Sequence, residues 1–302
     1  RRGFARRLVR LMARIALAID DRDWHARELL HALSARGATA VSVRLSDVDF
    51  DGSARHGMTL PSFGGALPDA VLVRAVSAGS FESVTRRLGV LHALDRLGVP
   101  VWNDARSIES CVDKSMTSFC IARAGLPTPP TWAVEGKEAA YAIAARECAA
   151  GALVLKPLFG SQGRGLRLIT RPDELPEPAE VAGVYYLQRY LPTGTAAFCD
   201  HRLFVCAGEV VAAMTRHADR WVTNLRRGGR AEAFAPTPDL VDLAVGAAEC
   251  VGARYAGVDL LRDNDGSAWV LEVNSMPGWK GLQKVTPHSI ADRIAAALLA
   301  TL

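Results

Sequence analysis

Alternating apolar and polar positions divide the first hundred residues into strands and helices. The helical periodicity of 24–37 and 81–98 predicts two amphipathic helices, each ending at a glycine. Short apolar runs predict strands at 14–20, 38–45, 69–76 and 99–102. The polar, glycine-rich segment 46–68 favours a loop or a ragged hairpin. This alternation of strand and helix predicts a small α/β lobe built on a parallel sheet.

The pattern changes in the second part of the chain. One helix from Asp104 to Gly125 is predicted, followed by an extended proline-rich connection at 126–132. Further helices are predicted at 136–150, 238–252 and 288–301. Strands separated by short turns are predicted at 152–158, 166–169, 184–191 and 201–216, with a hairpin tip at 207–210. The short spacings favour antiparallel pairing, so the whole chain is expected to be α/β with an α+β part.

Polar residues interrupt the apolar strand that ends in VLEVNSMPGW. Alternate residues of a strand share a face, so Glu272 and Asn274 project together, with Val270 and Val273 turned toward the core or the other face. The turn at 263–266 makes the preceding strand a hairpin partner and brings Asp259 opposite Glu272, or nearly so. Three oxygen-bearing side chains together suit Mg²⁺, and neighbouring carboxylates repel unless a cation lies between them. The alternative is a polar sheet edge that faces solvent.

A glycine-rich loop joins two predicted strands in VLKPLFGSQGRGLRLI. It fits neither the Walker A pattern nor a dinucleotide fingerprint, because it opens no helix. Its glycines, Gly160, Gly163 and Gly165, could instead let backbone N–H groups fold over phosphates as a flap. Lys156 stands on the strand just before the loop, where it could reach a phosphate. A flexible hairpin turn is the competing interpretation.

Composition and charge narrow the class of protein. The formal net charge of the 302 residues is +4, and residues 1–11 hold five arginines, so the rest of the chain carries 4 − 5 = −1. We therefore expect no nucleic-acid partner, and we interpret 1–11 as an upstream extension or vector remnant before Met12. No apolar run approaches the ~20 residues that span a bilayer, so no membrane association is expected. The six cysteines show no metal spacing and are expected to be small reduced residues of a cytoplasmic protein.

These motifs, in this order, resemble the ATP-grasp superfamily, and within it the RimK-like ligases that add glutamate to an acceptor. The resemblance extends from about Val101 to Thr286 and includes VLKPLFGSQGRG, LQRYLP, DHRLFV, TNLRRGG and LEVNSMPGW. It implies an ATP-grasp fold in which two lobes clamp ATP beside an N-terminal βαβ lobe. The implied boundaries are 12–104 for the N-terminal lobe, 105–190 for the small lobe with the flap, and 191–302 for the metal- and substrate-binding lobe.

The resemblance also implies which residues bind ATP. Lys114 and Lys156 would be the phosphate lysines, and Asp200 would approach the ribose. Thr223 and Asn224 would contact phosphate or substrate. The flap and the adenine hinge would be formed by Gly160, Ser161, Gln162, Gly163 and Gly165, and by Gln188, Arg189 and Tyr190. Related ligases often have an acidic residue where this chain has Arg189, so a side-chain contact at that position would be lost.

The remaining implied roles concern metal and substrate. Asp259, Glu272 and Asn274 would hold Mg²⁺ or Mn²⁺, with two ions expected. Arg202 and Arg216 would bind the substrate carboxylate and steady its acyl-phosphate, with Asn224 beside them as a catalytic residue.

The implied reaction is ATP-dependent formation of an amide. A carboxylate attacks the γ-phosphate of ATP, and an amine then displaces phosphate from the resulting acyl-phosphate. The expected partners are ATP, glutamate and an amine- or glutamate-bearing acceptor, which could be a protein C-terminus, a peptide, or a pterin, furan or deazaflavin cofactor. A homodimer or homotetramer is implied by the relatives. The alternatives are phosphotransfer to a hydroxyl, although H-R-D and D-F-G are absent from the sequence, and a non-catalytic nucleotide-binding protein.

Overall fold

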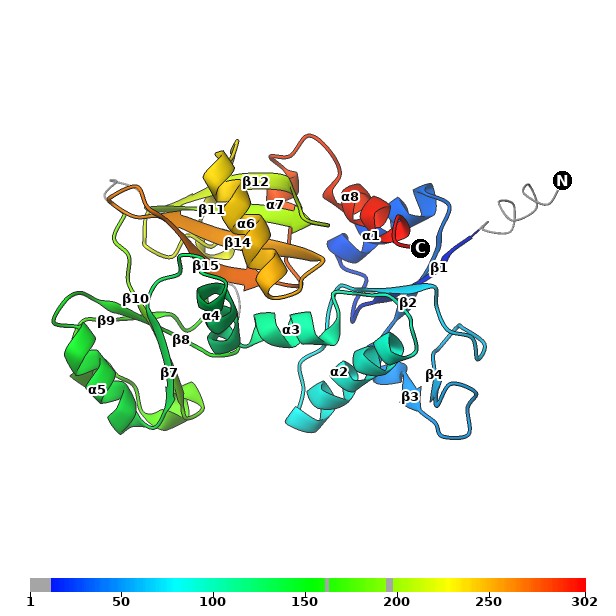
Figure 1. The fold of residues 1–302 in the computed structure, drawn as a ribbon, viewed down its shortest axis with the longest axis horizontal. Coiled ribbons are helices and arrows are strands. Elements are labelled where there is room, and N and C mark those ends of the chain that lie inside the picture. The colour runs from blue at the N-terminus through cyan, green and yellow to red at the C-terminus, as the bar shows by residue number, and fades with distance from the viewer. Residues whose placement is uncertain (1–11, 161–162, 194–197) are drawn as a thin grey trace.

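The computed structural model describes residues 12–160, 163–193 and 198–302. The expected extension 1–11 lies outside this part of the chain. In these ranges, three sheets of four or five strands, one two-stranded sheet and the helices around them form the molecule (Figure 1).

The N-terminal lobe contains the predicted parallel sheet. Its strand order is β2-β1-β5-β6, and each pair is parallel. The strands are β1 (Arg14–Ala18), β2 (Thr39–Val43), β5 (Ala70–Val73) and β6 (Val101–Trp102). The crossover helices are α1 (Trp24–Ala35) and α2 (Phe81–Arg96). The glycine-rich segment forms the small hairpin β3 (Asp49–Phe50) and β4 (Met58–Thr59), as the ragged-hairpin interpretation expected.

A second, antiparallel sheet forms the small lobe at the left of Figure 1. Its order is β7-β10-β8-β9, with helix α5 (Lys137–Glu147) against it. The strands are β7 (Thr131–Glu135), β8 (Leu153–Lys156), β9 (Arg167–Ile169) and β10 (Val184–Arg189). The sequence reading of 126–132 as a connection was incomplete, because Thr131 and Trp132 already pair with β10 as part of strand β7. The prolines come just before this strand, so they cost it no hydrogen bond.

The single helix predicted from Asp104 to Gly125 is wrong: the segment forms α3 (Ala105–Val112) and α4 (Lys114–Arg123). Asp113 leaves the helical conformation, with φ −81° and ψ 105°, and its Oδ1 accepts hydrogen bonds from the N–H groups of Ser115 and Met116. An aspartate in this position ends one helix and caps the next. The break places Lys114 at the start of α4.

The third sheet is the largest and carries the acidic hairpin. Its order is β13-β12-β11-β14-β15, and every pair is antiparallel. The strands are β11 (Phe198–Cys206), β12 (Glu209–Ala218), β13 (Arg230–Ala233), β14 (Tyr255–Arg262) and β15 (Ala268–Asn274). Strand β13 was not predicted. Helix α6 (Pro238–Cys250) buries one face of the sheet, and Ile121 of α4 joins the same core.

The other face of the large sheet packs toward the N-terminal lobe. Phe204, Tyr255 and Trp279 share a core with the β1 and β5 side chains. Short helix α7 (Lys280–Gln283) and the last helix, α8 (Ile290–Leu299), belong to this core, and α8 lies beside α1 (Figure 1). The 3₁₀ turns are at Leu45–Asp47, Pro172–Glu174, Pro178–Val181 and Leu225–Arg227. Among the described helices, none is long and apolar enough to cross a bilayer.

Candidate active site

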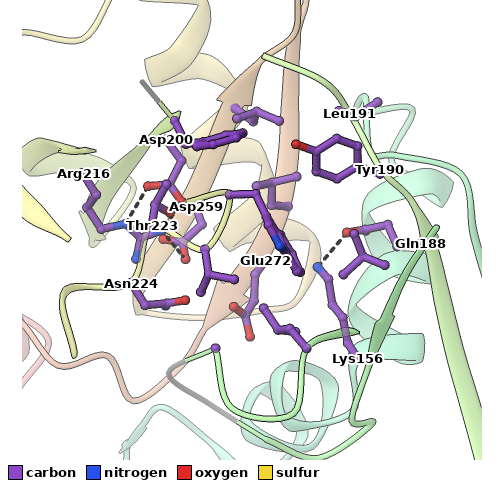
Figure 2. A pocket seen from close by; sticks show the side chains of 18 of the residues that line it. Lys156, Gln188, Tyr190, Leu191, Asp200, Arg216, Thr223, Asn224, Asp259 and Glu272 are labelled. Carbon is purple, nitrogen blue, oxygen red and sulfur yellow. Dashed lines mark hydrogen bonds and ion pairs between the residues drawn. The ribbon is translucent and has the colours of Figure 1, made fainter. Parts of the chain in front are cut away.

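A pocket lies between the small lobe and the large sheet, and most of the predicted site residues line it (Figure 2). Those that do are Lys114, Lys156, Gly160, Gly163, Gln188, Arg189, Tyr190, Asp200, Arg216, Thr223, Asn224, Asp259 and Glu272. Gly165, Arg202 and Asn274 are not among the lining residues. Ser161 and Gln162 lie outside the described part of the chain. The fold therefore gathers residues that are up to 158 positions apart, from Lys114 to Glu272.

The acidic hairpin has the register that the sequence indicated, with Asp259 opposite Glu272. The pairing then skips a residue, because Leu260 pairs with Val270, and Leu271 forms a bulge. The bulge explains how Val270 and Val273, three positions apart, both enter the core under α6. It also lets Leu271 and Glu272 both face the pocket. Asn274 pairs with Gly257 at the far end of the hairpin.

Asp259 is held by two arginines from neighbouring strands. Arg202 donates to both of its oxygens, from Nε at 2.6 Å and from Nη2 at 2.7 Å, and Arg216 Nη2 lies 3.0 Å from Oδ2. Burial by itself would raise the pKa of Asp259, but the two guanidinium groups outweigh it and lower the pKa to about 2. The carboxylate is therefore ionised at neutral pH.

Arg216 extends this chain of charges to Asp200. Its Nε and Nη2 donate to the two oxygens of Asp200 at 2.6 and 2.5 Å, and Thr223 Oγ1 donates to Asp200 Oδ2 at 2.6 Å. Burial would lower the pKa of Arg216, yet Asp259 and Asp200 raise it. Arg216 is only 2% exposed, and its Nε and Nη2 atoms are both engaged by protein carboxylates. Asp200 likewise has its oxygens engaged on the protein side.

The present hydrogen-bond partners of the three predicted metal ligands indicate whether these side chains could bind a divalent cation. Asn274 has a buried side-chain nitrogen with no hydrogen-bond partner among the described residues, and Glu272 points into the pocket (Figure 2). Asp259 would have to share its oxygens with Arg202 and Arg216. No group of three His, Cys, Asp or Glu residues is assembled in the described ranges. This set suits Mg²⁺, which is bound by one or two carboxylates and completes its shell with water and substrate phosphates.

The two predicted phosphate lysines reach the pocket from different elements, Lys156 from the end of β8 and Lys114 from the start of α4. Lys156 Nζ donates to Gln188 Oε1 at 2.6 Å, and Lys114 Nζ donates to the carbonyl of Gly160 at 2.8 Å. Burial lowers the pKa of both lysines, and the negative charge of Glu272 partly offsets this. Both ammonium groups thus lie near Glu272 and the glycine loop, where an anionic ligand would compensate their desolvation.

The adenine hinge proposed at 188–190 has fewer free groups than the sequence suggested. The N–H of Arg189 donates to Pro130 O at 2.8 Å, and that of Tyr190 donates to Ala152 O at 2.9 Å. Backbone contacts from these two residues to a base would therefore have to use their carbonyl oxygens. The Arg189 side chain donates to Glu147 at the end of α5, which gives the departure from the acidic pattern a structural role.

The glycine loop lies against the segment that carries Asn224. Gly163 has φ +66°, and a Cβ there would sit 2.4 Å from Asn224 Oδ1 and 2.9 Å from Val222 Cγ1. Gly165 has φ +73°, and its Cβ would lie 2.7 Å from Pro157 Cγ. Both positions need glycine for backbone conformation and for space.

Sequence reasoning missed the apolar part of the pocket. Its lining includes Val154, Leu166, Leu191, Trp221, Leu261 and Leu271. The ring of Trp221 meets that of Tyr190 edge to face, with centroids 6.1 Å apart. These side chains form an apolar part of the pocket next to its charged residues. Single apolar residues at strand ends leave no distinctive signal in the sequence.

An antiparallel lobe with a glycine loop and a buried lysine, set against a sheet whose hairpin presents acidic residues, defines the ATP-grasp class of ligases. The RimK-like ATP-grasp domain model matches residues 111–298. The chain belongs to this family.

Named relatives cover almost the whole chain. It is 31% identical over 310 residues to a tetrahydromethanopterin:alpha-L-glutamate ligase of Methanosarcina acetivorans, covering 90% of this chain and 94% of the relative. It is also 31% identical to a probable alpha-L-glutamate ligase of Chromohalobacter salexigens, with 92% of each covered. Among solved structures, the ATP-grasp ligase PsnB with minimal precursor has a TM-score of 0.74 at 21% identity, covering 97% of this chain and 100% of that chain. D-cycloserine synthetase DcsG has a TM-score of 0.66 at 21% identity, covering 95% and 99%.

Proposed function

We propose that this ligase uses ATP and Mg²⁺ to join a carboxylate to an amine, with L-glutamate as one of the two partners. Relatives at 30–36% identity are named as ligases of glutamate, which supports glutamate as a substrate. One observation carries the proposal at this site: the Asp259–Glu272 hairpin and two lysines line the same pocket, together with Gly160 and Gly163 of the glycine loop. That arrangement fits a triphosphate with its cation, because it offers positive and oxygen-bearing groups in one pocket.

In this proposal, some pocket residues position ATP and others compensate the negative charge of its phosphates. Lys156 and Lys114 would bind phosphate oxygens, exchanging their present bonds to Gln188 and Gly160 for stronger charged ones. Glu272, Asn274 and Asp259 would hold Mg²⁺, which offsets the charge that develops on the transferred phosphoryl group. A structural neighbour, PsnB, has been solved with Mg and ADP, which supports this cofactor pair. Trp221 and Tyr190 would lie beside the adenine base of ATP.

The reaction then needs no covalent group from the protein. The substrate carboxylate attacks the γ-phosphorus, ADP leaves, and the amine attacks the acyl-phosphate carbon and releases phosphate and a proton. The contact of Gly163 with Val222 and Asn224 would help to exclude water, which would otherwise hydrolyse the acyl-phosphate. Arg202 and Arg216 are held by acids, so their part is to fix Asp259 and Asp200. Bidentate binding of the substrate carboxylate through Nε and Nη2 of Arg216 would require Asp200 and Asp259 to release these atoms.

The first prediction tests the metal assignment. Glu272→Gln removes a charge while keeping the size of the side chain. We expect kcat for ADP formation to fall at least about a hundredfold, because the cation loses the carboxylate that no arginine holds. Coupled-enzyme ADP release with Mg²⁺ titration measures this, and circular dichroism checks the fold. Glu249→Gln on α6, outside the pocket-lining set, is the matched control. Turnover at the wild-type rate in Glu272→Gln would show that Glu272 does not bind the metal ion.

Trapping and mass spectrometry test the reaction itself. Hydroxylamine with ATP and the carboxylate substrate should give a hydroxamate, whereas a stable phosphorylated product without amide would favour phosphotransfer instead. A screen of acceptors with ATP, Mg²⁺ and glutamate should reveal a product heavier by one glutamyl residue. With ¹⁸O in the glutamate carboxylates, label appears in inorganic phosphate only if glutamate supplies the activated carboxylate.

A further inference from the structure

The carboxyl ends of β1 and β5 face the loop that follows the acidic hairpin. These strands are neighbours in the parallel sheet, and the segments after them carry Asp23 and Arg74. Arg74 Nη1 donates to the carbonyl of Met276, two residues beyond Asn274, at 3.2 Å. Ligands of open parallel sheets bind outside the carboxyl ends of the strands. None of the lining residues of the nucleotide pocket comes from this lobe, so the region is not explained by ATP.

Arg74 is a nearly buried cation whose charge is poorly compensated. Its side chain is 14% exposed, and the nearest carboxylate oxygen, Asp23 Oδ2, is 3.9 Å from Nη2. That carboxylate is already engaged, since it lies 2.9 Å from His25 Nδ1 and accepts from Ala26 N at 2.8 Å. Arg74 Nε is buried and has no partner among the described residues. A guanidinium has five N–H donors, and burying a donor that makes no hydrogen bond costs free energy.

The loop beside Arg74 carries further donors without acceptors. Trp279 Nε1 is buried and unpartnered within the described chain, and its ring lies 5.5 Å from the Arg74 guanidinium carbon. The side-chain nitrogen of Asn274, the last residue of β15 before this loop, is also unpartnered in the described part of the chain. Since these are donors, the missing group is an acceptor.

Besides Asp23 and Arg74, the titratable side chains placed at this loop are His25 and Lys280. His25 Nε2 accepts from the backbone N–H of Trp279 at 3.1 Å and of Lys280 at 3.2 Å, so that nitrogen carries no proton, and the neutral ring can donate its Nδ1–H to Asp23. Lys280 is exposed and forms no ion pair among the residues described. Arg74 and Lys280 carry two positive charges against the one negative charge of Asp23, and the carboxylate of Asp20, after β1, accepts from Ser77 Oγ.

We propose that Arg74, assisted by Lys280, binds the substrate carboxylate that is not activated, which makes this junction a recognition site for a dicarboxylic amino acid such as glutamate. The inference rests on the proposed function, because only a ligase of such a substrate needs a second carboxylate site. The position is suitable: Pro277 of the same loop lies over Gly257, where an added Cβ would be 2.9 Å from Pro277 Cβ and 3.8 Å from Arg202 Cδ. The loop thus connects Arg74 with the strand that carries Asp259.

Steady-state kinetics with separate variation of ATP and glutamate test the site. We expect Arg74→Ala to raise KM for glutamate at least tenfold and to change KM for ATP less than twofold, because the nucleotide pocket is built from other elements. Arg74→Lys keeps a point charge without the fork and should fall between wild type and Arg74→Ala. Lys280→Ala should raise KM for glutamate by a smaller factor. Arg96→Ala, an exposed arginine at the end of α2, is the matched control and should leave both constants unchanged.

A binding measurement separates failure of this site from failure of the proposed function. Calorimetry with L-glutamate, glutarate and L-norvaline should show binding of both dicarboxylates to wild type, weaker binding to Arg74→Lys, and little binding of norvaline, which lacks the second carboxylate. If no acceptor ever yields an amide with glutamate, the proposed function fails while loss of dicarboxylate binding in Arg74→Lys still supports the site. A folded Arg74→Lys or Arg74→Ala protein with wild-type KM and wild-type affinity for glutamate would overturn the inference.

Discussion

At the scale of single residues, the site is organised by which charges pair across strands. Asp259, Arg202 and Arg216 stand on three neighbouring strands, and Asp259 is paired with Arg202 in the ladder between β11 and β14. The bidentate geometry fixes the planes of both groups, as forked guanidinium–carboxylate pairs do. Breaking such a buried pair leaves a charge uncompensated, which is strongly destabilising. Asp259 therefore stabilises the fold, in addition to its predicted role as a ligand of the cation.

The pKa of Asp259 gives a prediction with a definite sign. Its folded value of about 2 lies below the ordinary 3.8, so the ionised group stabilises the fold above about pH 4, and this contribution is lost as the pH falls toward 2. Asp259→Asn lacks this titration. We expect the stability difference between wild type and Asp259→Asn to shrink by about 1 kcal/mol between pH 7 and pH 3. Urea denaturation at both pH values measures it, and equal differences at the two would contradict the assignment.

At the scale of elements, the glycine loop and the Val222–Asn224 segment fit together only because Gly163 lacks a side chain. Gly163→Ala adds a clash with Asn224 to the cost of a left-handed φ. Gly57→Ala is the matched control, because Gly57 has φ +71° and nothing within 4 Å of its would-be Cβ. Both variants therefore carry the same backbone cost, and only one disturbs the loop.

We expect Gly163→Ala to raise KM for ATP about tenfold, equivalent to about 1.4 kcal/mol, and Gly57→Ala to leave it unchanged. Initial rates at varied ATP concentration, with thermal unfolding as a check on the fold, measure the difference. Equal KM values in the two variants would mean that the loop does not need this contact to bind ATP.

At the scale of the whole molecule, Asn103 joins the N-terminal lobe to the large sheet. Its side chain is fully buried and donates to the carbonyls of Tyr255 and Ser275, each at 2.7 Å. Its Oδ1 accepts from Arg254 N at 2.6 Å and Tyr255 N at 3.2 Å. Because Ser275 follows Asn274, this one amide fixes the end of the acidic hairpin against the first lobe.

Asn103→Ala should cost about 3 kcal/mol of unfolding free energy, because it leaves several buried backbone groups without partners. We expect urea denaturation followed by circular dichroism to show a lower midpoint, with the N-terminal lobe unfolding before the large sheet. Asn264→Ala in the exposed turn before β15 is the control and should change stability by less than about 0.5 kcal/mol. A single transition at the wild-type midpoint would show that Asn103 does not couple the lobes.

The sequence by itself determined the local features of this protein. The turn at 263–266 was enough to pair the two strands and to bring Asp259 close to Glu272, although the bulge at Leu271 sets the exact register. Glycine spacing located the loop that lines part of the pocket. Strand period and turn chemistry act over a few residues, so they can be read from the chain. The helix break at Asp113 was also local, and its signal was an aspartate that can cap a new helix in the middle of the predicted one.

Only the tertiary structure decided which partner each charged group has. The family resemblance implied that Arg216 binds the substrate carboxylate, and in the fold its Nε and Nη2 atoms are bonded to Asp200 and Asp259. Arg74 gave no signal at all, and it becomes notable because its lobe meets the loop at Met276. Edge strands β7 and β13 likewise depend on neighbours far along the chain. The physical reason is common to all of these: pairing and desolvation depend on distance in space, which the order of residues does not contain.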